Sequence, residues 1–168
     1  QQRIGEALRA SETRLQAIWE NSPTVKFVKD LEGTYQLINK RFETIFQLSR
    51  DMIIGKKDRD LLNPPLARQI VENDQKVLNS RTPQEFEEQI QLPDGVHTYL
   101  STKFPLYNAE GTPYAICGIA TDITARKQTE QALKELNETL EQRVADRTRD
   151  LLVYQENLRA MASELVVT

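Results

Sequence analysis

The positions of glycine and proline divide the chain into three segments and limit what each can fold into. All seven prolines and five of the six glycines lie within residues 23–118, and none occurs in residues 119–168. Because these residues interrupt helices and build turns, the sequence predicts a turn-rich domain at 22–124. It is expected to lie between helical segments at 1–21 and 125–168.

The C-terminal segment carries one narrow apolar stripe with steps of three and four residues. Its seam positions are Leu133, Leu136, Leu140, Val144, Leu151, Leu158 and Leu165. A helix over 126–165 would be about 60 Å long at 1.5 Å per residue, and so narrow a stripe needs a partner helix in water. We expect a parallel dimeric coiled coil. The alternative is an amphipathic helix folded back on its own domain.

The N-terminal segment repeats this spacing at Ile4, Leu8, Leu15 and Ile18. It is predicted to be a coiled-coil or linker helix that ends before Pro23, because proline disfavours helix at the preceding residue. A chain that starts inside a heptad pattern is expected to be part of a longer protein. Together the two flanking helices predict a homodimer.

Composition excludes several classes of protein. The formal net charge of −3 makes nucleic acid an unsuitable partner. A single cysteine excludes a disulfide framework and a Cys-rich zinc site and favours the cytoplasm. No apolar run approaches the roughly 18–20 residues that span a bilayer, so direct membrane insertion of this chain is not expected. Hydrophobic residues make up only 39% of the chain. This low fraction is expected if the two flanking helices bury only their narrow apolar seams.

The central segment has the residue pattern of an α+β domain. Five strands are predicted at 25–28, 35–38, 84–92, 96–107 and 113–123, from β-rich runs bounded by turn residues. Two helices lie between the second and third strands, one capped by Asn39 and one at 67–78. The stretch between these helices is predicted to be loop-rich. The buried side chains of the second helix are expected to be Ile70, Val71, Val77 and Leu78. Strands that follow one another through short turns form an antiparallel sheet.

Several motifs in this order carry a resemblance to a known family. They are Lys29-Asp30-x-x-Gly33, Asn39-x-x-Phe42, Ile54-Gly55-Lys56, Asn73-Asp74, Asp94-Gly95, Lys103-Phe104-Pro105-Leu106 and Gly118-Ile119-Ala120-Thr121-Asp122-Ile123-Thr124. Over residues 23–127 the chain resembles a PAS domain, the sensory module common in bacterial signalling proteins. The resemblance implies a five-stranded antiparallel sheet with short helices on one face. Residues 140–148 resemble the helix that links PAS domains to histidine kinase cores, and residues 158–165 resemble the start of a kinase dimerisation helix.

No catalytic residue, metal ligand or cofactor is predicted. His97 is the only histidine and Cys117 the only cysteine, and a free cysteine in an apolar strand usually acts as a small hydrophobe. Flavin-binding PAS domains carry a reactive cysteine where this chain has residues 58–63, and haem-binding ones usually supply a histidine from the helix at 65–80; neither residue is present. His97 as an axial haem ligand is the open alternative.

A small unidentified ligand is nevertheless compatible with the resemblance. The expected pocket residues are Phe27, Phe42, Ile45, Ile70, Ser101, Lys103, Ile116, Gly118 and Ala120. A lysine at the pocket edge would favour an anionic ligand. The alternative is a filled core in which Lys103 extends to solvent.

The junction between the last strand and the C-terminal helix is the expected point of signal coupling. Asp122 could pair with Arg126 or Lys127, and Thr124 could cap the helix. The resemblance thus implies the sensory and dimerisation module of a bacterial two-component sensor histidine kinase. Its partners would be a kinase core and an upstream sensory domain, and this segment would not itself be an enzyme. The alternatives are a haem or flavin sensor of redox state or light, a structural dimerisation spacer, and a module that feeds a diguanylate cyclase.

Overall fold

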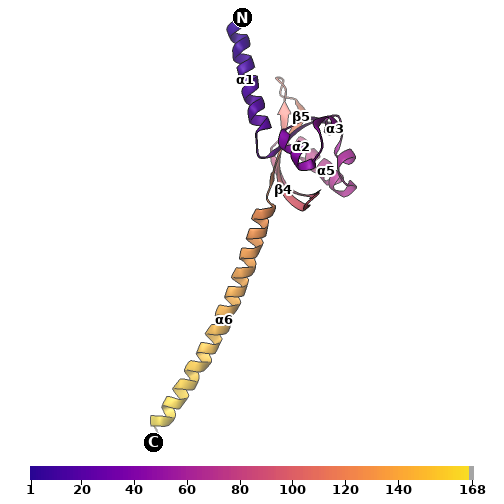
Figure 1. Cartoon of the computed structure of the whole chain (residues 1–168). Helices are drawn as coiled ribbons and strands as arrows, with labels where there is room; N and C mark the ends of the chain where they lie inside the picture. The colour runs from indigo at the N-terminus through magenta and orange to yellow at the C-terminus, as the bar shows by residue number, and fades with distance from the viewer. Residues whose placement is uncertain (167–168) are drawn as a thin grey trace. The chain divides into compact units, whose positions relative to one another are not determined.

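The computed structural model describes residues 1–166, so residues 167 and 168 of the predicted C-terminal segment lie outside it. Its elements are α1 Gln2–Glu20, β1 Val25–Asp30, β2 Tyr35–Ile38, α2 Lys40–Phe46, α3 Arg50–Ile53, α4 Asp58–Leu61, α5 Pro64–Ser80, β3 Gln84–Leu92, β4 Gly95–Tyr107, β5 Pro113–Asp122 and α6 Thr124–Val166. The strands form one antiparallel sheet with the order β2-β1-β5-β4-β3. Figure 1 labels β4 and β5 of this sheet. The predicted α+β fold with a five-stranded antiparallel sheet is confirmed.

The helices of the domain begin where side chains can replace missing backbone partners. The Asn39 side chain accepts the N–H of Phe42 at the start of α2, and Asn63 accepts that of Leu66 at the start of α5. The segment predicted as loop-rich contains the short helices α3 and α4. Each has only four residues, which is too short for a helical periodicity to be visible in the sequence.

The buried side of α5 differs from the prediction. Ile70 and Val77 are buried, but Val71 is exposed, while Asn73 and Asp74 are buried. A helix can turn a carboxylate inward when buried cations face it, and the cations come from strands far away in the sequence. Periodicity of apolar residues therefore placed Ile70 and Val77 correctly, was wrong for Val71, and missed the two buried polar residues; Leu78 is half-buried.

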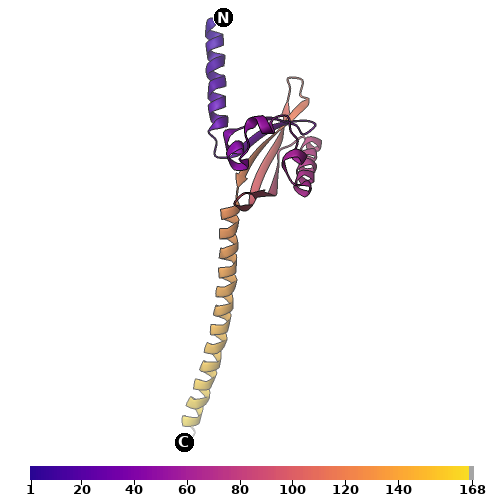
Figure 2. The same ribbon diagram turned by 45° about the vertical axis from the view of Figure 1, so that its right-hand side comes forward.

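The two faces of the sheet are covered differently. The main core lies between the sheet and the short helices and contains Phe27, Tyr35, Phe42 and Ile70; Figure 2 shows α5 alongside the strands with which it packs. On the opposite face Val28, Ala115 and Cys117 form a smaller cluster, against which Trp19 of α1, Phe104 and Leu106 pack.

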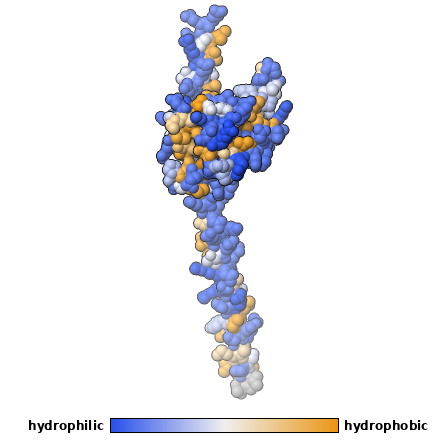
Figure 3. Space-filling model, turned by 90° about the vertical axis from the view of Figure 1, so that its right-hand side faces the viewer, coloured by the Kyte–Doolittle hydropathy of each residue, from blue (hydrophilic) through white to orange (hydrophobic). Residues whose placement is uncertain are grey.

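The flanking helices expose their predicted seam positions in the single chain, and the end of α1 at Trp19 and Glu20 is half-buried. The chain divides into two compact units, Gln1–Thr124 and Ala125–Thr168. In their described residues, α1 and α6 contain no buried side chain. The predicted seam positions are exposed, from 47% for Leu140 to 80% for Leu165 in α6, and apolar side chains recur along both helices in Figure 3. Neither these nor any other helix within residues 1–166 is long and apolar enough to span a membrane.

Candidate functional site: a buried charge network, a small cavity and a strand-to-helix junction

A cavity of about 30 Å³ lies between the sheet and the helices of the domain. A water molecule needs roughly 10–15 Å³ measured in this way, so the cavity has room for one or two. Six of the nine expected pocket residues line it: Phe27, Phe42, Ile70, Ser101, Lys103 and Ala120. The Tyr99 hydroxyl, which lines the same cavity, is buried without a hydrogen-bond partner among the described residues.

The other three expected residues do not line this cavity. Gly118 lies on the same face of β5 as Ala120, which lines the cavity. The ring of Phe27 fills the space above Gly118, so Gly118 does not reach the cavity. Ile116 is buried further along β5, where it lines a separate outer hollow that includes Asp74. Ile45 is half-buried and packs against the main core from α2.

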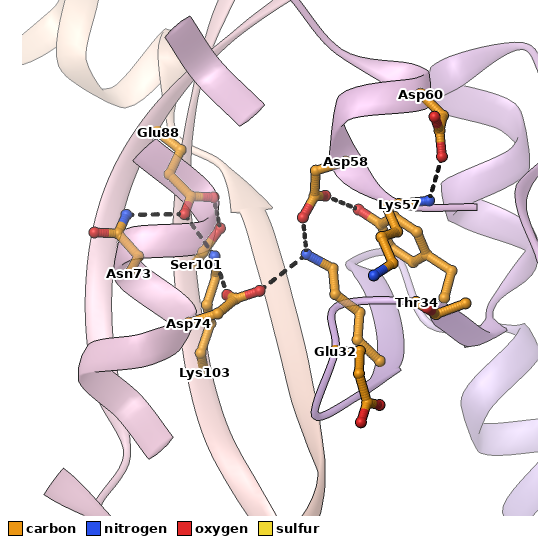
Figure 4. A network of polar contacts seen from close by, with 12 residues as sticks. Glu32, Thr34, Lys57, Asp58, Asp60, Asn73, Asp74, Glu88, Ser101 and Lys103 are labelled. Carbon is orange, nitrogen blue, oxygen red and sulfur yellow. Dashed lines mark hydrogen bonds and ion pairs between the residues drawn. The ribbon is translucent and has the colours of Figure 1, made fainter. Parts of the chain in front are cut away.

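A network of buried charges forms the polar end of the cavity (Figure 4). The Nζ atom of Lys29 donates to Asp58 at 2.6 Å and to Asp74 at 3.0 Å. The Nζ atom of Lys103 donates to the other oxygen of Asp74 at 3.0 Å and to Glu88 at 2.7 Å. Both lysine side chains are 0% exposed. Asp74 therefore joins two ammonium groups that have no contact with solvent.

Neutral donors complete the network. The Tyr35 hydroxyl donates to Asp58 at 2.7 Å, and the Ser101 hydroxyl donates to Glu88 at 2.9 Å. The Asn73 side-chain amide donates to Glu88 at 3.3 Å. Burial, followed by the nearby Asp58 carboxylate, raises the pKa of Tyr35 well above its usual value, which keeps this hydroxyl a donor.

The network changes the interpretation of Lys103. Burial alone would lower the pKa of this lysine, but the carboxylates of Asp74 and Glu88 outweigh that effect and raise it. The lysine is therefore charged, and it does not extend to solvent as the filled-core alternative expected. With Lys29 and Lys103 facing three carboxylates, the network carries a formal charge of −1. Such a site repels anions, so the expected preference for an anionic ligand does not fit it.

Sequence reasoning missed most of this network, including Lys29, Asp58 and Glu88. One signal was available: Glu88 shares its strand face with Phe86 and Ile90, because successive side chains alternate across a strand. A charged residue on an apolar face is a candidate buried charge. Asp58 and Lys29 are 29 residues apart and belong to different elements, so no local pattern connects them.

The junction between β5 and α6 forms a compact hydrogen-bonded unit. Asp122 Oδ1 accepts both the N–H and the hydroxyl of Thr124, at 2.9 and 2.6 Å. The Thr124 hydroxyl oxygen in turn accepts the backbone N–H of Thr98, and the N–H of Ile123 donates to the Thr98 carbonyl. Asp122, rather than Thr124, thus accepts the backbone N–H at the helix start. Arg126 donates to Glu130 one turn along α6.

His97 joins this junction from β4. Its Nδ1 lies 2.6 Å from Asp122 Oδ2, and its Nε2 lies 3.0 Å from Asp94 Oδ1 in the β3–β4 turn. Cys117 is on the opposite face of the sheet, so the two residues form no catalytic pair. Burial raises the pKa of the Cys117 thiol to about 11. Within residues 1–166 no group of three or more His, Cys, Asp or Glu side chains is arranged to hold a metal ion.

Comparison with known proteins agrees with this architecture. The chain is 34% identical over 122 residues to the methanogenesis regulatory histidine kinase FilI of Methanothrix harundinacea, covering 72% of this chain and 14% of that protein. It is 26% identical over 121 residues to the aerobic respiration control sensor protein ArcB of Escherichia coli, covering 71% and 16%. A diguanylate cyclase of Vibrio cholerae is 29% identical over 116 residues, covering 67% and 36%. The chain thus spans only a minor part of each relative.

A solved structure and a family model locate the similarity in the central domain. The PAS domain of Bordetella pertussis BvgS superposes with a TM-score of 0.60 at 23% identity, covering 77% of this chain and 98% of that structure. A family model described as the PAS fold matches residues 19–128. That match includes the whole sheet, the short helices, the buried network and the β5–α6 junction. The chain therefore belongs to the PAS fold family.

Proposed function

We propose that this chain is the sensory and dimerisation module of a two-component sensor histidine kinase in the cytoplasm. The observation that carries the proposal is the β5–α6 junction, where a core strand continues into a 43-residue helix after the single residue Ile123. A change in strand position there must move Thr124, the first residue of that helix. The similarity to FilI and ArcB supports a kinase core as the partner.

The exposed seams support dimerisation through a second copy of the chain. A helix of 43 residues with its apolar positions in water is poorly satisfied alone. Pairing of two α6 helices would bury Leu133, Leu136, Leu140 and the later seam positions, and α1 offers Ile4, Leu8, Leu15 and Ile18 in the same way. In this proposal the two helices connect the domain to an upstream sensory domain and to the kinase core.

The input is proposed to be a small uncharged ligand or a displacement of α1. The cavity and the unpaired Tyr99 hydroxyl suit a very small polar molecule, and about 30 Å³ does not accommodate a haem or a flavin. A path from α1 is equally direct. Glu20 at its end pairs with Arg50 at 2.9 Å, and the Trp19 carbonyl accepts from the buried Asn39 side chain.

A structural dimerisation spacer is the second candidate function, and the small size of the cavity favours it. A fusion of residues 1–168 to the kinase core of FilI distinguishes the two. Two residues inserted into α6 rotate everything beyond them by about 200°, whereas seven residues restore the seam. A signalling module changes autophosphorylation after the two-residue insertion and recovers it after the seven-residue insertion. Equal autophosphorylation in all three proteins would contradict the proposal.

Oligomeric state is the independent test of dimerisation. Sedimentation equilibrium of the chain should give twice the mass of 19.4 kDa. Leu140→Asp places a charge in the seam and should yield monomers, while Gln142→Asp, on an exposed position away from the seam, should leave the dimer intact. A monomeric wild-type chain at high micromolar concentration would refute pairing through these helices.

A diguanylate cyclase as the output domain is compatible with every step of this proposal up to α6, as the Vibrio cholerae relative suggests.

A further inference from the structure

The single histidine of the chain bridges two carboxylates that belong to different parts of the domain. Asp94 lies in the turn between β3 and β4, and Asp122 is the last residue of β5. The two ring nitrogens of His97 lie 3.0 and 2.6 Å from them. The histidine therefore connects a surface turn to the residue that holds the first N–H of α6.

The bridge depends on the charge of the imidazole ring. A protonated ring has an N–H on each nitrogen and can donate to both carboxylates, whereas a neutral ring has one N–H and one lone pair. A lone pair that faces a carboxylate oxygen is repelled by it. Loss of one proton must therefore break one of the two contacts, whichever tautomer remains.

We propose that His97 is a proton-operated clasp that ties the β3–β4 turn to the start of α6 when protonated and releases one of these attachments when neutral. The clasp adds a pH response to the proposed signalling function. Its effect on α6 rests on that proposed function, whereas the histidine contacts themselves do not. The contact with Asp122 is the more consequential of the two, because the same carboxylate accepts the N–H and hydroxyl of Thr124.

The electrostatic surroundings favour the protonated, closed form of the clasp. The hydrogen bond to Asp122, together with the charge of Asp94, raises the pKa of His97 against the opposing effect of partial burial. Hydrogen bonds from Thr124 and His97 lower the pKa of Asp122, although burial alone would raise it. Tyr99, two residues along β4, is linked to the same carboxylates: burial, Asp122 and Asp94 raise its pKa, while Arg41 of α2 acts in the opposite direction.

The pH range follows from the direction of these shifts. The ordinary pKa of histidine is about 6.5, and the folded value lies above it. The stabilisation from the clasp is therefore complete below about pH 6.5 and is lost as the pH rises through the folded pKa. The charge is partly open to solvent, so added salt should weaken the shift.

Nuclear magnetic resonance of the intact chain tests the clasp directly, because a chain freed of any purification tag has one histidine. The imidazole resonances should titrate above pH 6.5 in the wild type. The titration should move downward in Asp94→Asn, an exposed turn position that leaves the fold intact, and further in Asp122→Asn. Glu110→Gln in the distant β4–β5 turn removes the same charge and should leave the titration unchanged. A wild-type value at or below 6.5, or one that neither Asp substitution lowers, would overturn the clasp.

The fused kinase tests the consequence separately. Autophosphorylation should depend on pH through the His97 titration, and His97→Gln, which cannot be protonated in this range, should flatten that dependence while the protein still dimerises. If the resonance shift is present but the wild type and His97→Gln share one pH profile, then the clasp stands and its role in the proposed signalling is refuted.

Discussion

Replacement of Gly118 by alanine should destabilise the domain by forcing a core ring out of position. An added Cβ would lie 2.6 Å from Cε1 and Cε2 of Phe27, and closer still to Cζ, whereas ordinary van der Waals contact begins near 3.4 Å. The ring must therefore move by at least 0.8 Å. It is confined by edge-on contacts with Tyr35 and Phe42, whose ring centroids are 5.8 and 6.3 Å away.

The expected loss follows from the cost of overpacking. Forced shifts in a well-packed core typically cost about 1–3 kcal/mol, and a movement of this size in a buried aromatic cluster belongs at the upper end, near 2–3 kcal/mol. Equilibrium unfolding in urea measures it from the transition midpoint. Gly5→Ala is the matched control, because nothing lies within 4 Å of an added Cβ there, and it should be neutral or slightly stabilising.

The double variant decides whether the Phe27 ring is the cause. Phe27→Leu removes the ring atoms that collide, so it should reduce the additional cost of Gly118→Ala by more than 1 kcal/mol, a coupling that contacting residues commonly show. The double variant also remains informative if Gly118→Ala alone fails to fold. Costs that simply add, or a Gly118→Ala protein within 0.5 kcal/mol of the wild type, would refute the packing argument.

Three further substitutions and reactions test other parts of the domain. Lys103→Met removes the cation that Asp74 and Glu88 share, so three buried carboxylates face Lys29 alone, and it should cost about 3–5 kcal/mol in the free energy of unfolding. Adding Glu88→Gln should recover part of this loss, and a mild loss in Lys103→Met would contradict a buried charge. Asn39→Ala removes a buried side chain that makes four hydrogen bonds, each worth about 1 kcal/mol. A thermal melt should therefore show a loss of several kcal/mol in stability. Little change would mean that solvent replaces these bonds. Cys117 has a pKa of about 11, so only about a thousandth of its thiol is ionised at pH 8. It should therefore react with a disulfide reagent far more slowly in the folded chain than in urea. Equal rates would place the thiol at the surface.

Local sequence patterns predicted the bounds of several helices and strands well, because turn residues, caps and apolar periodicity act between neighbours in the sequence. The strand at 113–123 differs from β5 by one residue, and the helix at 126–165 differs from α6 by two residues at its start and one at its end. The N-cap role of Asn39 also follows from a side chain and an N–H three residues apart. These features depend on neighbours in the sequence, so one sequence is sufficient to identify them.

The candidate site was harder to predict because its contacts cross the fold. The side of β4 that carries Ser101 and Lys103 was placed correctly on the core face, but their acidic partners depend on how α5 rotates against the sheet. His97 meets Asp122 across 25 residues and two strands. Its local sequence does not indicate these partners, because its contacts arise from the pairing of β4 with β5.

The chain of charges through Asp74 also constrains how sequences with this core can diverge. Lys29 and Lys103 share this one carboxylate, but each also has a carboxylate of its own, Asp58 or Glu88. Loss of either lysine leaves three buried carboxylates facing one ammonium group, whereas loss of Asp74 leaves two matched ion pairs. We therefore expect related domains to vary more freely at Asp74 than at the two lysines, and to lose a lysine only together with a carboxylate.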